Sequence, residues 1–505
     1  MEGTREAILK RIMEWVPNPQ ENLQERNWKS QGDIYWVYGS PGLGKTALAH
    51  SVCATLQDRE QLAGAFFCQR DNKSLSEPGN ILSTLIYKLA GIFPHFRTIV
   101  AEHLSKDPNL TPQSMPDTLL VDFIHSLRRP PMQPTLVFVI DALDECGNSQ
   151  SRSDLLKVLI DAAALAPWLK IIVTSRPEVD IIQSFLTVPA KYDLGADEEA
   201  KDDLRTFARS QFRSVASKWH LSTTWPEEPL FSKVTSQANG LFIFIETLSH
   251  ALQRHNPEIY LKEMLQGSVN AELEPLFGLY TRLLKAQLPP NNIAEFWQML
   301  VVITTAQYRP LCAEAIANLA RVEPNVIEKW VDDLSSLLYR DEKANNAIRA
   351  RHLSIIEFLV DDLCEYKASL QDAHARLGIA CLETMVGQLR FNICELEDSR
   401  LANADVKDLE SRIERYISEP LQYGCLYWSN HISKTPDHDD WRALGLGSLR
   451  KFFEGLSPLF WIEVLSILGM VPIGAPSLRR IISWVKVSRA LAHLCLHSRM
   501  ILIGL

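Results

Sequence analysis

The sequence predicts an α/β fold, in which a parallel sheet carries helices on both sides, followed by an α-helical region. Short runs of β-branched and aromatic residues alternate with helical patterns as far as residue 194, and strands this apolar are typical of sheets buried on both faces. A glycine-rich stretch joins the first run to a helix, and beyond residue 195 the strand patterns give way to helical ones.

The composition is that of a folded protein with more than one domain. The chain has 505 residues, 46% of them hydrophobic, and a net charge of −9. The negative charge gives no general attraction to nucleic acid, and no uncharged apolar run is long enough to predict a membrane span. Nine scattered cysteines without a CxxC pair, and a charged N-terminus unlike a signal peptide, predict a cytoplasmic protein with reduced thiols.

Five strands and the helices between them make up the predicted sheet domain. The strands are expected at 34–39, 63–69, 135–143, 170–177 and 190–194. Before them, Ile8, Ile12 and Trp15 form the apolar face of a helix. Helical patterns at 78–93 and 117–128 fill the connection between the second and third strands.

One hairpin interrupts the helical region. Helical patterns at 312–320 and 324–338 lead into a strand, a polar turn and a second strand within 337–353, and the stretch at 354–363 predicts a further helix. Helices followed by such a hairpin indicate a winged helix. Residues 240–252 are apolar nearly all round, which predicts a buried helix.

The glycine-rich stretch matches the phosphate-binding pattern G-x4-G-K-[ST]. This phosphate loop consists of Gly39, Ser40, Pro41, Gly42, Leu43, Gly44, Lys45 and Thr46, and Ala47 follows it. Glycines let the backbone curl so that its N–H groups point at phosphate oxygens, and the following helix adds the positive end of its dipole. Lys45 is expected beside the β- and γ-phosphates and Thr46 on Mg²⁺. A strand before the loop and a helix after it favour this interpretation over a surface turn.

Three carboxylates follow the third predicted strand. They are Asp141, Asp144 and Glu145. Because ligands of open α/β sheets bind at the carboxyl ends of the strands, Asp141 is expected to hold Mg²⁺ through water. Either Asp144 or Glu145 is expected to orient an attacking water. The alternative interpretation is a solvated acidic loop after a core strand.

The fourth predicted strand ends in Thr174, Ser175 and Arg176. A hydroxyl and a guanidinium at this position are suited to sensing a γ-phosphate, and we expect Ser175 and Arg176 to do so. The alternative is a helix cap and a surface arginine before a proline.

Taken together, these motifs resemble the NACHT family, the signal-transducing STAND class of P-loop NTPases. The resemblance rests on the order and spacing of "GSPGLGKTAL", "VFVIDALDEC" and "IIVTSRPE". Weaker similarities to the fungal members of the family are "FFCQRDN", "QANGLFIFIETL" and "RARHLSIIEFLVD", in which Ile355 stands where the family usually has Phe. The resemblance implies a role in signal transduction of the fungal innate-immunity type.

The resemblance divides the chain into five parts. These are an N-terminal helix and linker at 1–30, a NACHT P-loop NTPase domain at 31–194, a helical domain at 195–285, a winged-helix domain at 286–365 and a C-terminal helical region at 366–505. It further implies that ADP is buried between the NTPase, helical and winged-helix domains. His352 is then expected on the ADP β-phosphate, and Arg5 is expected to frame the base.

The leading hypothesis is a nucleotide-gated switch that binds ATP or ADP with Mg²⁺, hydrolyses ATP slowly and forms a homo-oligomer when ATP is bound. The alternative is a non-hydrolysing scaffold that holds ADP.

A metabolic kinase is disfavoured because no arginine-rich lid follows the fourth strand, and DNA binding by the winged helix is disfavoured because "NVIEKWVDDLSSLL" is acidic. The motifs do not distinguish ATP from GTP. No effector domain or repeat array is recognisable, so the sensed ligand and the effector partner are left open.

Overall fold

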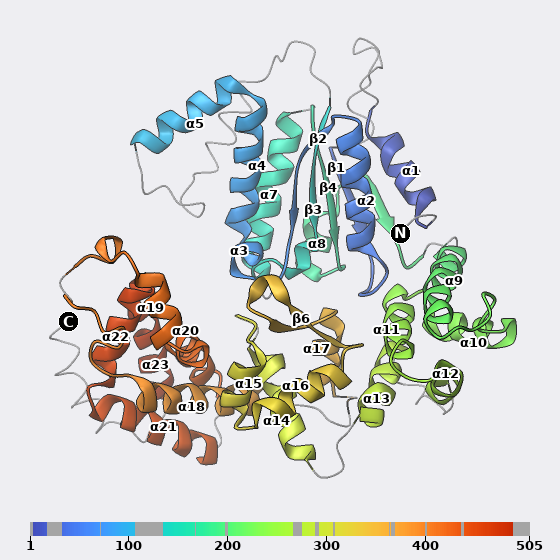
Figure 1. The fold of residues 1–505 in the computed structure, drawn as a ribbon. Helices are drawn as coiled ribbons and strands as arrows, with labels where there is room; N and C mark the ends of the chain where they lie inside the picture. The colour runs from blue at the N-terminus through green and yellow to red at the C-terminus, as the bar shows by residue number, and fades with distance from the viewer. Residues whose placement is uncertain are drawn as a thin grey trace. The chain divides into compact units, whose positions relative to one another are not determined.

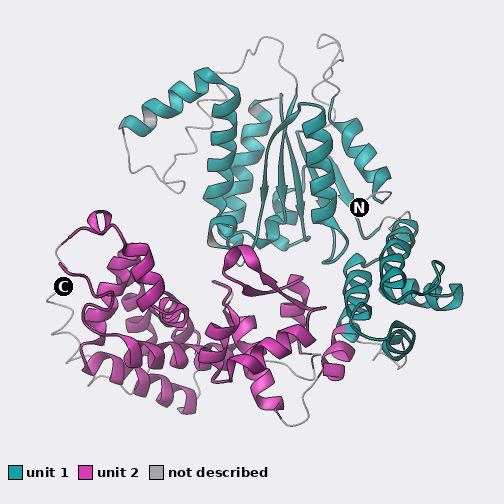
Figure 2. Ribbon diagram, in the orientation of Figure 1, with its two compact units in different colours: residues 1–279 teal, residues 280–505 magenta. Residues whose placement is uncertain are grey.

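A computed structural model describes most of the chain (Figure 1). The described residues are 4–17, 33–70, 72–106, 135–166, 168–196, 200–265, 275–287, 292–306, 309–362, 364, 369–398, 401–435 and 439–487. The helix predicted at 117–128 lies outside them. The chain divides into two compact units, Met1–Leu279 and Tyr280–Leu505 (Figure 2).

A parallel five-stranded sheet forms the centre of unit 1. Its strands are β1 (Ile34–Tyr38), β2 (Leu62–Phe67), β3 (Leu136–Asp141), β4 (Leu169–Ser175) and β5 (Ala190–Asp193). Their order in the sheet is β2-β3-β4-β1-β5, and every pairing is parallel. Every residue of β3 and β4 is buried, as expected for the central strands of a sheet covered on both faces. The predicted parallel sheet is therefore confirmed.

Helices cover the two faces of this sheet (Figure 1). One face packs on α1 (Glu6–Trp15) and α2 (Lys45–Asp58), and the other on α4 (Pro78–Ile92), α7 (Ser149–Leu165) and α8 (Val179–Ser184). Because successive side chains of a strand point to opposite faces, Val137, Val139 and Ile172 lie on the α2 face. Phe138, Ile140 and Val173 lie on the α7 face. This alternation decides which polar residues at the strand ends can face the phosphate loop.

The other described part of unit 1 that follows the sheet is helical. It contains α9 (Ala200–Lys218), α10 (Glu228–Ala238), α11 (Phe242–Leu252), α12 (Pro257–Leu265) and the first part of α13 (Pro275–Gln287); α3 (Lys73–Ser76) and α5 (Pro94–Lys106) belong to the sheet domain. Most residues of α11 are buried, which confirms the buried helix predicted at 240–252. Phe207 of α9 packs against Phe242 at the start of α11.

Within its described residues, unit 2 is helical except for one antiparallel hairpin. Its elements are α14 (Ile293–Thr305), α15 (Ala313–Ala320), α16 (Pro324–Asp333), β6 (Leu338–Asp341), β7 (Ala347–Ala350), α17 (Leu353–Val360), α18 (Leu370–Gln388), α19 (Leu409–Tyr416), α20 (Glu419–Ile432), α21 (Asp439–Glu454), α22 (Ser457–Ile467) and α23 (Gly474–Val487). The sequence predicted the order of two helices, a hairpin and a third helix. Among the described residues, every helix is too short or too polar to cross a membrane.

Candidate functional site

The phosphate loop connects β1 to α2, as its pattern predicts. Gly42 and Gly44 adopt φ angles of +81° and +82°, a left-handed conformation that residues other than glycine rarely adopt. A Cβ atom on Gly42 would also lie 2.2 Å from Cγ2 of Ile243. Both glycines are thus required for the turn of the loop, and Gly42 is also required for its contact with α11. Ser40 and Pro41 lie within this turn, and Ala47 lies in the first turn of α2.

Lys45 folds back over the loop. Its Nζ atom donates hydrogen bonds to the carbonyl oxygens of Gly39, at 2.7 Å, and Ser40, at 2.9 Å. Burial lowers the pKa of Lys45 to about 8, although the negative charges of Asp144, Asp141 and Glu145 act in the opposite direction. The ammonium group therefore lies within electrostatic reach of all three predicted carboxylates.

Asp141 ends β3 on the α2 face of the sheet and meets the first turn of α2. Burial raises the pKa of its carboxyl group, and hydrogen bonds from the hydroxyls of Thr174 and Thr46 lower it. The structure thus brings Thr46 and Asp141 together, as expected of a pair that holds a metal ion. A hydroxyl and a carboxylate are oxygen ligands of the kind that Mg²⁺ prefers. Thr174 contributes a contact that our expectation for this strand end did not include.

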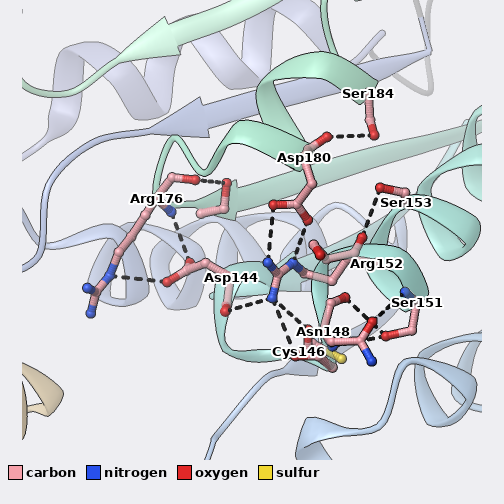
Figure 3. A network of polar contacts seen from close by, with 12 residues as sticks. Asp144, Cys146, Asn148, Ser151, Arg152, Ser153, Arg176, Asp180 and Ser184 are labelled. Carbon is pink, nitrogen blue, oxygen red and sulfur yellow. Dashed lines mark hydrogen bonds and ion pairs between the residues drawn. The ribbon is translucent and has the colours of Figure 1, made fainter.

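Asp144 is paired with Arg176 (Figure 3). It lies in a short 3-10 turn, Leu143–Glu145, that begins after Ala142 at a φ angle of +53°. The backbone N–H of Arg176 donates to Oδ1 of Asp144 at 2.9 Å, and Nε lies 3.2 Å from Oδ2. The side chain of Asp144 is 3% exposed, and this ion pair compensates its buried charge.

Glu145 lies beside Asp144 at the end of the same turn. Burial and the negative charge of Asp144 raise the pKa of Glu145 to about 6. The backbone N–H of Arg70 donates to its Oε2 at 3.3 Å and acts in the opposite direction. A carboxylate with a pKa near 6 is suited to accept a proton near neutral pH.

Arg152 of α7 holds the turn that carries these two carboxylates (Figure 3). Its guanidinium donates to both carboxylate oxygens of Asp180, at 2.8 and 3.1 Å, and to the carbonyl oxygens of Asp144 and Cys146, at 3.4 and 3.2 Å. Sequence reasoning missed this residue. The two charged partners are separated by most of α7 and all of β4, so no local pattern relates them.

Ser175 lies on the opposite face of the sheet from Asp141. Its fully buried hydroxyl accepts a hydrogen bond from Trp36 Nε1 at 2.8 Å and donates to the carbonyl oxygen of Arg176 at 2.9 Å. This geometry corrects the expectation that the hydroxyl senses a phosphate, because alternation along β4 turns Ser175 into the core and Thr174 towards α2. The link of Ser175 to the loop is through its backbone, since its carbonyl oxygen accepts from the N–H of Gly39 at 3.3 Å.

His352 belongs to unit 2, whereas the phosphate loop belongs to unit 1. It caps the N-terminus of α17, where its Nδ1 atom accepts from the backbone N–H of Ser354 at 3.2 Å. Nδ1 also lies 2.7 Å from the Ser354 hydroxyl, which in turn contacts the Tyr280 hydroxyl at 2.7 Å. Its role at a β-phosphate stays a prediction.

The sheet and the phosphate loop together define the fold of a P-loop NTPase. A protein-family model described as "Nephrocystin 3, N-terminal" matches residues 12–176. No protein with a curated description matches the chain. The match runs from within α1 to the end of β4 and includes the phosphate loop.

Solved structures with similar folds are distant. Cdc6p from Pyrobaculum aerophilum is 11% identical with a TM-score of 0.35, over 69% of this chain and 90% of that one. A Walker-type ATPase of Pyrococcus abyssi is 11% identical with a TM-score of 0.33, over 71% and 95%. Drosophila ORC bound to DNA is 13% identical with a TM-score of 0.30, over 74% and 86%. At TM-scores below 0.5, these similarities carry no argument about what this chain does.

Proposed function

We propose that the protein is a nucleotide-gated switch that binds ATP or ADP with Mg²⁺ and hydrolyses ATP slowly. The observation that supports this is the convergence of Lys45 and Thr46 from the phosphate loop with Asp141 and Glu145 from the end of β3. A lysine, a hydroxyl and carboxylates around a curled loop are the groups needed to bind a nucleotide polyphosphate and a divalent cation. Mg²⁺, when bound, would neutralise charge on the phosphate oxygens.

Each group at the site has a distinct role in this proposal. Thr46 and Asp141 hold the cation, and Lys45 exchanges its bonds to the loop carbonyls for bonds to phosphate oxygens. Glu145 accepts a proton from the attacking water, for which its raised pKa suits it. Arg176 contacts the γ-phosphate, and its ion pair with Asp144 holds it at the end of β4.

Hydrolysis would reset a conformational change. On the resemblance to NACHT proteins, the helical domain at 195–285 and the winged-helix domain at 286–365 close over ADP, with His352 on its β-phosphate. Exchange for ATP would open these domains and allow cytoplasmic homo-oligomers to form, in signalling of the fungal innate-immunity type. A difference of a few kcal/mol between nucleotide states, on the order of 2 to 5, would be enough to shift the population.

A non-hydrolysing, ADP-bound scaffold is the second candidate. It is favoured by the way the site satisfies its own charges, because Lys45 is bonded to two loop carbonyls and Asp144 is paired with Arg176. Such an arrangement needs no turnover to be stable. The two candidates share a nucleotide site and differ in phosphate release.

The test combines binding, turnover and size. Purified protein is analysed by mass spectrometry for co-purifying nucleotide and titrated with the fluorescent analogue mant-ADP in Mg²⁺, then assayed for phosphate release from ATP and from GTP. The switch predicts bound ADP, slow phosphate release and a larger particle with ATP in light scattering. Bound ADP without phosphate release would favour the scaffold. Absence of mant-ADP binding would overturn both.

A further inference from the structure

Two carbonyl groups of the phosphate loop are held from outside the loop. The backbone N–H of Phe242 donates to the carbonyl oxygen of Gly42 at 2.9 Å. The guanidinium of Arg5 donates through Nη2 to the carbonyl oxygen of Leu43 at 2.9 Å. Both donors come from distant parts of unit 1, namely the start of α11 and the residue before α1. We call these two hydrogen bonds the carbonyl clamp.

The α11 side of the clamp is a helix N-terminus. The first N–H groups of a helix have no acceptor within the helix, and here the carbonyl of Gly42 supplies one. The N–H of Ile243 points at the same oxygen, at 3.4 Å, and its side chain leaves no room for a Cβ atom on Gly42. The loop and the helix are therefore in direct contact along their backbones.

Arg5 joins the clamp to the rest of the helical domain. The residue is 3% exposed, and its guanidinium lies over the ring of Phe242, 5.1 Å from the centroid. Its backbone N–H donates to Oδ2 of Asp203 in α9 at 3.0 Å. One residue thus contacts the phosphate loop, α9 and α11, and its guanidinium is engaged with a loop carbonyl and an aromatic ring.

The clamp has a consequence for the opposite side of the loop. A peptide unit is planar and trans, so its N–H group points away from its carbonyl group. When the carbonyls of Gly42 and Leu43 are held towards Phe242 and Arg5, the N–H groups of Leu43 and Gly44 are held in the opposite direction. Fixing these donors before the ligand arrives lowers the entropic cost of binding.

From this geometry we propose that the carbonyl clamp sets the nucleotide affinity of the phosphate loop and couples it to docking of the helical domain. The inference rests on the proposed function, since the ligand is the same nucleoside diphosphate. Arg5 acts as a positioning residue, through the loop and not on the ligand. Because linkage is reciprocal, a docked α11 tightens nucleotide binding and bound nucleotide holds α11 in place. Undocking of α11 then releases nucleotide for exchange.

One pair of variants isolates the Phe242 hydrogen bond. Phe242 is the first residue of α11, where proline is tolerated, and Leu241 before it has φ −84° and ψ 107°, which a following proline accepts. Phe242→Ala and Phe242→Pro both remove the ring, but only the proline variant loses the N–H donor. We expect mant-ADP to dissociate about three- to tenfold faster from Phe242→Pro than from Phe242→Ala. Equal dissociation rates would overturn the inference.

A second pair tests the arginine. Arg5→Met is expected to release mant-ADP about tenfold faster, because it loses a charged hydrogen bond, and Arg5→Lys should restore part of the loss. Arg11→Met is the matched control, since Arg11 lies nearby on α1 and, like Arg5, over an aromatic ring, that of Tyr192 at 5.1 Å. Equal release rates for the Arg5→Met and Arg11→Met variants would contradict the inference.

Hydrogen exchange measures the coupling directly. In the wild-type protein, ADP should slow exchange of the Phe242 amide, and in Arg5→Met this protection should be smaller. Unchanged exchange of that amide on ADP binding would overturn the coupling, whatever the release rates. If wild-type protein bound no mant-ADP, the proposed function would fail and the inference with it, whereas wild-type binding with unaltered variants would remove the inference alone.

Discussion

The carboxyl edge of the sheet in unit 1 and the packed helices α18 and α20 in unit 2 treat buried ionisable groups differently. In unit 2, His431 is fully buried, with Nδ1 2.8 Å from Nδ1 of His374 and Nε2 2.8 Å from the hydroxyl of Tyr423. Burial lowers the pKa of His374 to about 4 and that of His431 well below its usual range. Both histidines are therefore neutral near pH 7, and each bond joins uncharged partners.

The carboxyl edge brings carboxylates together with basic side chains instead. Asp141, Asp144 and Glu145 crowd together, and burial raises the pKa of Glu145 to about 6 without making it neutral at pH 7. Repulsion among carboxylates costs stability, which a protein built for stability alone would avoid by using neutral pairs, as unit 2 does. The comparison teaches that a cluster of buried carboxylates, next to a lysine and a curled loop, indicates a ligand site, whereas neutral pairs indicate packing.

Among variants at the carboxyl edge, we expect Lys45→Ala to have the largest effect. Lys45→Ala deletes the ammonium that would bond to phosphate oxygens, so the affinity for mant-ADP in fluorescence titration should fall about 100-fold or more. Lys191→Ala is the control, because Lys191 of β5 donates to a surface carbonyl, that of Leu186, at 2.9 Å. Unchanged affinity in Lys45→Ala would remove the phosphate-loop assignment.

Glu145 should separate binding from turnover. Glu145→Gln keeps the size of the side chain but cannot accept a proton, so phosphate release from ATP should slow about 100-fold while mant-ADP affinity stays within about twofold. The matched variant is Asp144→Asn, which breaks the ion pair with Arg176. Normal turnover in Glu145→Gln, with slow turnover in Asp144→Asn, would transfer the base role to Asp144.

The sheet and the outline of the site could be predicted from sequence because both depend on local patterns. Continuous apolar runs specify buried strands, and the residues that follow them meet at one edge of the sheet. Strand alternation places Thr174 and Ser175 on opposite faces of the sheet. Which of the two faces α2 depends on which face of the sheet α2 covers, and only the packing of the whole domain decides that. The contacts of Arg152 with Asp180 and of Arg5 with Leu43 join residues far apart in sequence, so no periodic pattern in the sequence predicts them.

Unit 2 provides the contrasting stability test. His431→Leu would remove the contacts of His431 with Nδ1 of His374 and with the Tyr423 hydroxyl, and the loss of a buried hydrogen bond costs about 1–3 kcal/mol. We expect the thermal unfolding transition of this unit to shift down, with mant-ADP affinity unchanged. His431→Gln, which retains a donor and an acceptor, should recover part of the loss. A fall in nucleotide affinity in His431→Leu would show that the cluster contributes to the ligand site.

The pH dependence of turnover tests the raised pKa of Glu145. A proton acceptor must be ionised, so kcat/KM should fall about tenfold for each pH unit below about 6 and level off above it. The sign follows from the raised pKa, since the carboxyl group of Glu145 is protonated below about 6 and ionised at pH 7. In Glu145→Gln the residual kcat/KM should not show this fall at low pH. If the fall persists in this variant, another group is responsible for the titration.

The smallest expected effect distinguishes the two neighbouring residues at the end of β4. Thr174→Val removes the hydroxyl that donates to Asp141 with little change of shape, so the Mg²⁺ concentration needed for half-maximal turnover should rise about three- to tenfold. Ser175→Ala removes a hydroxyl that contacts Trp36 on the other face, and it should change that concentration by less than about twofold. If Ser175→Ala had the larger effect, strand alternation would not decide which side chain serves the metal. Such a result would mean that, at the end of β4, the face on which a side chain lies does not decide whether it contributes to the ligand site.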